Sequence, residues 1–263
     1  MLAPGLLTAA ALEAVRSNIR PGITTLELDA IAERVIRDGG GEPNFMLEPG
    51  YRHTVCASVN AAIVHGVPND RALEPGDLVS IDCGAIVDGW NGDAAFSAVV
   101  PDAERPDLVA ERQRLADVTE QSLWAGIAAL AEARHLNDIG GAIEDVITDA
   151  DATWGIVEDF TGHGIGRSMH EDPPVFNYRV RERGPKVKAG LVVAIEPMVT
   201  LGTIESHTLA DDWTVVTDDG ADAAHWEHTV AVHADGIWVL TAADGGAAQL
   251  AAFGVVPTPL TQP

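Results

Sequence analysis

Acidic residues stand at the ends of strongly apolar runs in two distant parts of the chain. Asp82 and Glu196 each directly follow such a run, and Asp93 and Glu227 each open the next one. An ionised carboxylate at the end of a buried strand is costly unless it is paired or bound to a cation. Four carboxylates that met at one place would also repel each other strongly. This pattern predicts a shared site that is neutralised by two divalent metal ions.

A nitrogen ligand is expected from the segment TGHGIGRSMHEDPP (161–174), in which glycines flank His163 and leave its imidazole unhindered. One histidine with four carboxylates is a hard, oxygen-rich donor set, which suits Mn, Fe, Co or Zn better than Cu. Two such ions can bridge a water, lower its pKa towards ~7 and polarise a carbonyl. The residue types therefore indicate hydrolysis, and they leave both peptide bonds and phosphoesters open as the bond that is cleaved.

Three helices are expected around these acidic strands. The segment 24–40 has apolar residues at helical spacing, Thr24 or Thr25 as a cap, and glycines at its end. A second helix is predicted over 106–131, and a third over 137–150 with Asn137 as its cap.

The strands are expected to carry the acids. Residues 76–100 indicate two strands joined by a turn at Asp88-Gly89, and 190–200 and 226–240 indicate further strands. The segment after Ala242 is rich in Ala, Gly and Pro, so we expect it to pack loosely.

The sequence also contains signs of an internal repeat. LDAIAERVI (28–36) aligns with IGGAIEDVI (139–147), and GDLVSID (76–82) aligns with GLVVAIE (190–196) at nearly the same offset. Buried strands resemble each other in any protein, because they are all rich in Val and Ile. Helix and strand matches that recur in the same order favour a duplication, in which each half supplies two acids.

Composition limits the class of protein. The chain has 263 residues, of which 46% are hydrophobic, and a formal net charge of -24. A functional explanation of this acidity is that most of the surface repels nucleic acid and anionic membranes. The simpler explanation of the negative charge is solubility or adaptation to a salty cytoplasm. The chain has two cysteines, no basic residue before Arg16 and no long uncharged apolar run, so we expect a cytoplasmic protein without a signal peptide or membrane span.

Four segments resemble the signature blocks of type I methionine aminopeptidases: IDCGAIVDGWNGD (81–93), GHGIGRSMHEDP (162–173), AIEPMV (194–199) and WEHTV (226–230). The resemblance extends from about residue 8 to residue 240. It implies an α+β, pita-bread (creatinase/aminopeptidase) fold, in which two pseudo-symmetric αβ halves surround a dinuclear metal centre. The halves would be about 8–105 and 106–240, within a single catalytic domain of residues 1–263.

The resemblance also implies roles for individual residues. Asp93 and Glu227 would bridge the two metal ions, Asp82 would hold one ion, and His163 and Glu196 would hold the other. Glu196 would also take the proton from the attacking water.

Two further histidines would act on the substrate. His170 would stabilise the tetrahedral intermediate, and His65 would contact the region of the scissile amide. The remaining histidines, at positions 53, 135, 207, 225, 228 and 233, are interpreted as ordinary surface or core residues.

The pocket for the methionine side chain is expected to involve residues from four segments. Besides His65 and His170, they are Phe45, Tyr51, Cys56, Met169 and Trp213. The chain departs from the usual family pattern at three places. Glu48 stands where a pocket tyrosine is usual, Met169 where a phenylalanine is usual, and Asn91 where a histidine is frequent.

The resemblance implies an aminopeptidase that removes the initiator methionine when the second residue is small. Two alternatives of the same fold remain: a hydrolase of Xaa-Pro bonds, like aminopeptidase P or prolidase, and a non-catalytic binding protein. The expected partner is the N-terminus of a peptide or nascent chain, with no DNA and no membrane. The basic segment RVRERGPKVK (179–188) prompts a further hypothesis, a weak contact with the ribosome, whose simpler alternative is a solvated loop.

Overall fold

Long antiparallel strands run through the centre of the molecule. The computed structural model describes residues 1–260, and its longest strands are β4 (Leu78–Val87) and β5 (Trp90–Val99). Asp88 and Gly89 join them with positive φ angles of 52° and 71°, as a two-residue hairpin turn requires. The strand–turn–strand pattern predicted for 76–100 is confirmed.

β5 is also the strand at which the two halves of the chain meet. The main sheet has the order β1-β4-β5-β14-β9-β7-β8, with β2 beside β4 and β15 beside β14, and all the pairs are antiparallel. The other strands of this sheet are β1 (Glu42–Pro43), β2 (Val55–Val59), β7 (Gly162–Gly164), β8 (Glu171–Val175), β9 (Val192–Ile195), β14 (Glu227–His233) and β15 (Gly236–Val239).

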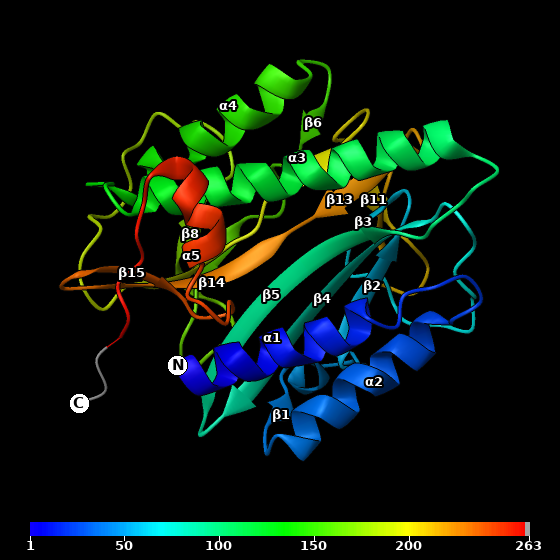
Figure 1. Ribbon diagram of the computed structural model, residues 1–263, viewed down its shortest axis with the longest axis horizontal. Helices are drawn as coiled ribbons and strands as arrows, with labels where there is room; N and C mark the ends of the chain where they lie inside the picture. Colours follow the sequence, from blue (N-terminus) through cyan, green and yellow to red (C-terminus); the bar gives the residue numbers. More distant parts are fainter. Residues whose placement is uncertain (261–263) are drawn as a thin grey trace.

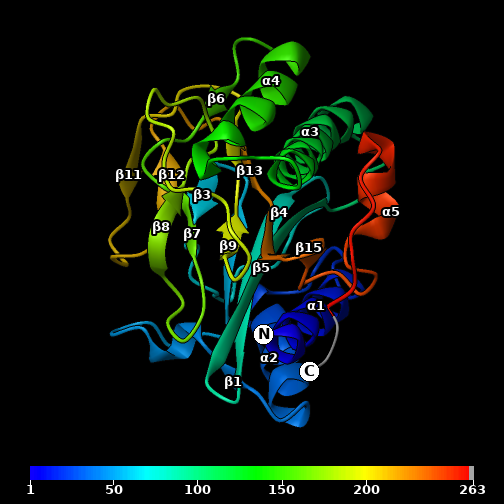
Figure 2. The same cartoon turned by 90° about the vertical axis from the view of Figure 1, so that its left-hand side faces the viewer.

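Three helices pack on this sheet, and a fourth packs on the third of them. They are α1 (Leu2–Arg16), α2 (Thr25–Asp38), α3 (Pro106–Leu130) and α4 (Gly140–Ala150). α1 packs on β4 and β5, and α3 packs on β5, β14 and β9. Figure 1 shows α1 and α2 on one side of the long strands and α3 and α4 on the other, and Figure 2 shows α1, α2, α3 and α5 gathered to the same side of the sheet. The arrangement agrees with the predicted α+β fold of two similar halves.

The ends of the helices follow the sequence with one exception. Thr24, one of the two residues predicted as possible caps, caps α2 through a capping box with Glu27. The prediction that Asn137 caps the third helix is wrong. Asn137 lies in a 3₁₀ turn (Leu136–Asp138), Ile139 precedes α4, and the Asn137 side-chain amide donates instead to the Glu182 carbonyl at 2.9 Å.

The C-terminal segment is better packed than expected. Its short helix α5 (Ala247–Leu250) contacts α3, and the 3₁₀ turn η3 (Ala251–Phe253) follows. Leu250 is fully buried in the same apolar core as residues of both halves, such as Ile81 and Ile195. The prediction of loose packing is therefore wrong for this part of the tail, because one leucine among its small residues reaches the core.

Two further sheets have three strands each. One has the order β13-β10-β6 and the other β11-β12-β3. Their strands are β3 (Ala62–Val64), β6 (Gly155–Ile156), β10 (Met198–Thr200), β11 (Ser206–Thr208), β12 (Val215–Thr217) and β13 (Ala223–His225), and the 3₁₀ turn η1 (Phe45–Leu47) precedes β2. No helix within residues 1–260 is long and apolar enough to cross a membrane.

Candidate metal centre and substrate pocket

The register of three central strands places three of the predicted ligands together. Asp82 on β4 and Glu227 on β14 both lie opposite Ala95 of β5, one from each side. Asp93 is two residues before Ala95, and side chains two apart on a strand point to the same face. The small methyl group of Ala95 therefore lies among three carboxylates that share one face of the sheet.

His163 and Glu196 complete the cluster from the neighbouring strands. His163 on β7 lies opposite Ala194 of β9, and Glu196 directly follows β9. His163 Nδ1–H donates to the Gly164 carbonyl oxygen at 2.9 Å, which leaves Nε2 free to bind a metal ion. His163 Nε2 lies 3.5 Å from Glu196 Oε1, and ligand atoms of His163, Asp93 and Glu227 lie within 4.8 Å of one another.

The protein environment opposes ionisation of these carboxyl groups. Burial raises the pKa of Asp82 and of Glu196 to about 7. Burial and, after it, the neighbouring carboxylates raise the pKa of Asp93 and of Glu227 well above the usual range. The cluster cannot carry all its negative charges at neutral pH unless cations neutralise them.

Unpartnered oxygen atoms give an independent test of whether metal ions fit. Asp82 Oδ1, Asp93 Oδ1 and Glu227 Oε1 are buried and have no hydrogen-bond partner among the described residues. Buried polar atoms without a partner are rare in folded proteins and require an explanation such as an ion. Hard oxygen donors beside a histidine whose Nε2 is free make a donor set that suits divalent metal ions.

All the predicted site residues border one cavity of about 370 Å³. The five predicted metal ligands form one part of its wall, and the predicted substrate residues form the rest. The lining residues are Phe45, Glu48, Tyr51, Cys56, His65, Asp82, Asp93, Asp159, Phe160, Thr161, His163, Met169, His170, Glu196, Met198, Trp213 and Glu227.

An apolar recess, to which both halves of the chain contribute, occupies one side of this cavity. Phe45, Tyr51 and Cys56 are buried together, and Met169 and Trp213 pack against them. The rings of Tyr51 and Trp213 meet edge to face with centroids 4.9 Å apart, and the Tyr51 hydroxyl donates to the Val55 carbonyl oxygen at 2.8 Å. The recess therefore has soft, fixed walls, with the half-buried Glu48 as its charged neighbour.

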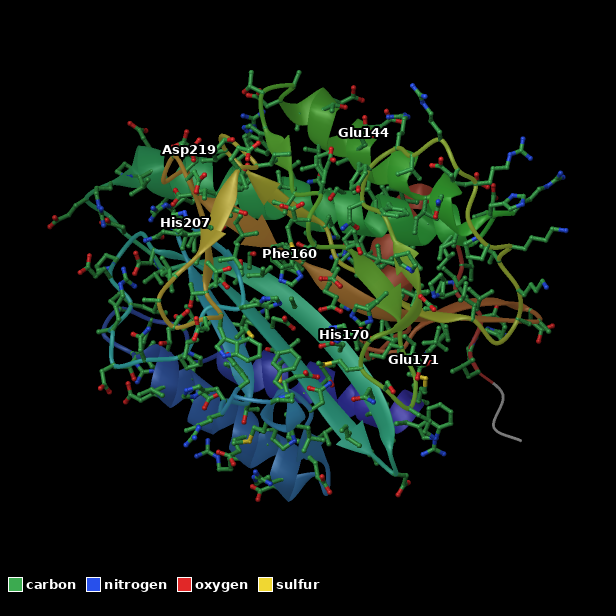
Figure 3. All side chains as sticks on the ribbon, turned by 180° about the vertical axis from the view of Figure 1, so that it is seen from behind. Glu144, Phe160, His170, Glu171, His207 and Asp219 are labelled. Atoms are coloured by element: carbon green, nitrogen blue, oxygen red, sulfur yellow. The ribbon has the colours of Figure 1, made fainter. Side chains whose placement is uncertain are left out.

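The two histidines predicted to act on the substrate line the same cavity as the carboxylate–histidine cluster. The ring centroids of His170 and His163 are 4.5 Å apart, and those of His65 and Phe160 are 5.4 Å apart. Burial lowers the pKa of His65 to about 4 and also lowers the pKa of His170, so both imidazoles are neutral at neutral pH. Figure 3 looks onto the face of the sheet opposite the helices, where His170 and Phe160 lie near the centre of the view.

Asn91 fixes the loop that carries His170. Its side-chain amide donates to the carbonyl oxygens of Gly166 and Arg167, both at 3.2 Å, and its main-chain N–H donates to Gly166 at 2.9 Å. The Arg167 guanidinium lies over the Trp90 ring, 4.0 Å from its centroid. This departure from the usual family pattern therefore connects the β4–β5 hairpin to the loop of the second half.

Sequence reasoning missed several residues at the site. Three of them adjoin a recognised block: Phe160 and Thr161 precede His163, and Met198 belongs to AIEPMV. His225, interpreted as an ordinary residue, is 2% exposed, and its Nε2 lies 3.6 Å from Glu196 Oε2. His225 is two residues before Glu227, but this spacing does not reveal its proximity to Glu196.

The basic segment 179–188 lies away from this cavity. Arg179 is paired, since its guanidinium lies 2.6 Å from Asp145 Oδ2 and 3.5 Å from Glu144 Oε1. The other four basic residues of the segment are exposed and make no ion pair within residues 1–260.

The chain is similar to known metallopeptidases along most of its length. A model of metallopeptidase family M24 matches residues 1–234. The chain is 49% identical to methionine aminopeptidase 1 of Mycobacterium tuberculosis over 246 residues, which cover 92% of this chain and 91% of that protein.

Solved structures show the same relation. The crystal structure of methionine aminopeptidase from Thermotoga maritima matches with a TM-score of 0.85 and 34% identity, over 92% of this chain and 94% of that one. Prolidase from Pyrococcus furiosus matches with a TM-score of 0.68 and 21% identity, over 92% of this chain but 62% of that one. The prolidase therefore shares the fold alone.

Proposed function

The chain belongs to metallopeptidase family M24 and, within it, to the methionine aminopeptidases, and we propose that it removes N-terminal methionine from peptides and nascent chains with a small second residue. Its fold is the pita-bread fold of that family. One observation supports this proposal most strongly. A single cavity of about 370 Å³ contains both a carboxylate–histidine cluster that suits divalent ions and an apolar recess for a thioether side chain.

We assign five residues as ligands of two divalent metal ions. Asp93 and Glu227 would bridge the ions, Asp82 would complete one site, and His163 with Glu196 the other. The donor set suits Mn, Fe, Co or Zn. When bound, such ions acidify a water molecule and polarise a carbonyl group. Because both halves contribute ligands, we infer that residues 1–263 act as one catalytic domain.

The protein's own residues would then bind and orient the substrate. The recess formed by Tyr51, Cys56 and Trp213 would hold the methionine side chain, since sulfur packs favourably against aromatic rings. Holding the first residue there brings its carbonyl group to the wall that carries the ligands, which reduces the entropic cost of reaction.

Three residues would accept a proton, stabilise negative charge or contact the scissile amide. Glu196 would accept the proton of the attacking water. His170 would donate a hydrogen bond to the oxygen that becomes negatively charged as the carbonyl is attacked. His65, whose pKa is lowered to about 4 by burial, would contact the scissile amide as a neutral imidazole.

A small set of peptides tests this function against its nearest rival. With metal supplied, Met-Ala-Ser should be cleaved rapidly, whereas Met-Leu-Ser and Leu-Ala-Ser should react about ten-fold more slowly or worse, the effect of a misfitting apolar group. A matched pair of variants, Tyr51→Ala in the recess and Tyr178→Ala outside it, should separate the pocket from general effects of losing a tyrosine. Rapid cleavage of Ala-Pro-Ser without cleavage of Met-Ala-Ser would favour an Xaa-Pro peptidase instead.

We also propose that the segment 179–188 contacts ribosomal RNA near emerging chains. Its exposed basic residues can neutralise phosphates, although the strongly acidic remainder of the surface opposes this and predicts weak, salt-sensitive binding. Charge reversal at Arg181 and Arg183 should weaken co-sedimentation with ribosomes, whereas reversal at the equally exposed Arg20 and Arg34 should have little effect. Peptide hydrolysis should survive both changes, and unchanged co-sedimentation across a salt series would exclude the contact.

A further inference from the structure

His225 has a main chain that is held unusually firmly. It ends β13, where it lies opposite Met198 of β10. Its N–H is shared between the hydroxyl oxygens of Ser97 at 3.1 Å and Ser80 at 3.3 Å, and its carbonyl oxygen accepts from the Ser97 hydroxyl at 2.9 Å. Because these serines belong to β4 and β5, the position of His225 is fixed relative to the strands that carry Asp82 and Asp93.

The side chain of His225 is directed at the carboxylate of Glu196. The residue is 2% exposed, and its Nε2 has no hydrogen-bond partner among residues 1–260. That nitrogen lies 3.6 Å from Glu196 Oε2, while the other oxygen, Oε1, lies 3.5 Å from His163 Nε2. The Glu196 carboxylate therefore stands between two imidazoles, of which only that of His163 borders the cavity.

The position of His225 indicates a supporting role rather than metal ligation. All five assigned ligands line the cavity, whereas His225 does not, so it approaches Glu196 from behind. A buried imidazole without a partner is costly, and a neighbouring carboxylate is the acceptor that would satisfy it.

We propose that His225 is a positioning residue of the metal centre, whose Nε2–H donates a hydrogen bond to Glu196 Oε2 and so holds Oε1 towards the ion shared with His163. The proposal rests on the metal centre of the proposed function. A movement of about 0.5 Å brings the two atoms to hydrogen-bond distance. Hydrogen bonds to the outer oxygen of a ligating carboxylate fix its orientation, and their loss typically lowers metal affinity or activity by about 10- to 100-fold.

Metal affinity of two variants tests this role. In titrations of the metal-free protein with Mn²⁺, His225→Ala should bind more weakly than wild type by about 10- to 100-fold. His225→Gln should stay within about threefold of wild type, because its side-chain amide presents an N–H donor near the position of Nε2. Binding by His225→Ala as tight as wild type, or binding by His225→Gln as weak as that of His225→Ala, would overturn the proposal.

A neighbouring histidine supplies a matched control. His228 is bonded through Nδ1 to the Thr241 hydroxyl at 2.8 Å and lies beside the ring of Trp124, on the helical side of the sheet. His228→Asn replaces one buried imidazole by an amide that can keep that bond, so the affinity for Mn²⁺ should not change. An equal loss of affinity in both histidine variants would show a general effect of packing and would count against the positioning role.

A spectroscopic measurement on the unaltered chain keeps the proposal testable if a variant does not fold. With ¹⁵N-labelled histidine and Zn²⁺, the Nε2 of His225 should remain protonated in the metal-loaded protein, and the signal of a metal-bound nitrogen should come from His163. A metal-bound nitrogen in His225 would overturn the proposal. Binding of metal by the wild-type protein tests the proposed function separately, whereas the difference between Ala and Gln at position 225 tests only the positioning role.

Discussion

Glu196 should reduce the stability of the metal-free protein, by an amount that depends on pH. Burial raises the pKa of Glu196 from 4.5 to about 7 in the folded protein, although His163 opposes part of the rise. Between these two values the unfolded chain has released a proton that the folded protein still holds. Ionisation of Glu196 therefore does not lower the free energy of unfolding below about pH 4.5. As the pH rises from there through about 7, the free energy of unfolding declines.

The size of this effect follows from the two pKa values. One pKa unit corresponds to about 1.4 kcal/mol, so a rise from 4.5 to about 7 corresponds to about 3 kcal/mol for this fully buried group. Glu196→Gln removes the ionisable group and keeps the shape of the side chain. The free energy of unfolding of Glu196→Gln minus that of wild type should be about 2–3 kcal/mol larger at about pH 8.5 than at about pH 5.

Urea unfolding with a chelator present, at both pH values, measures this difference. Glu111→Gln, on the exposed surface of α3, is the matched control and should change the unfolding free energy by less than about 0.5 kcal/mol at either pH. Added Mn²⁺ should then stabilise wild type more than Glu196→Gln, because only wild type keeps the full ligand set. A difference between Glu196→Gln and wild type that does not vary with pH would contradict a raised pKa for Glu196.

Three other predictions concern metal ligation, N-terminal processing and stability. Glu227→Ala removes a bridging ligand, so at least one metal ion should be lost and kcat/KM should fall by about 10³-fold or more, as metal analysis and peptide assays would show. If the chain is expressed from Met1, Leu2 is too large for a rule that requires a small second residue, so intact-mass measurement should find Met1 retained. Complete removal of Met1 would contradict the rule. The Asp29 carboxylate accepts hydrogen bonds from the main-chain N–H groups of Thr54 and Val55 at 2.7 and 2.9 Å. Asp29→Ala leaves these groups without their partner and should lower the free energy of unfolding in urea by about 1–3 kcal/mol. An unchanged midpoint would show that water satisfies those groups equally well.

The β4–β5 hairpin shows what local sequence can predict. Asp82 and Asp93 are eleven residues apart, and a two-residue turn at Asp88-Gly89 fixes the register between their strands. Alternation along each strand then places both carboxylates on one face. This part of the site needed only short-range rules. The similarity of the two halves extended the same reasoning to Glu196 and Glu227.

His225 shows where such rules end. Its importance depends on Glu196, which is 29 positions away, and on two serines from the first half of the chain. Neither burial nor an unpartnered nitrogen can be read from the tripeptide Ala-His-Trp. The same limit explains the tail, since the burial of Leu250 depends on the space beside α3 and not on the Ala- and Gly-rich residues around it.

Anomalous diffraction from a crystal grown with Mn²⁺ would test the metal centre most directly. The assigned ligands predict two anomalous peaks inside the cavity. One should contact Asp82, the other should contact His163 and Glu196, and Asp93 and Glu227 should touch both. Absence of any peak at these carboxylates, in a protein that still cleaves Met-Ala-Ser under the same conditions, would contradict the assignment.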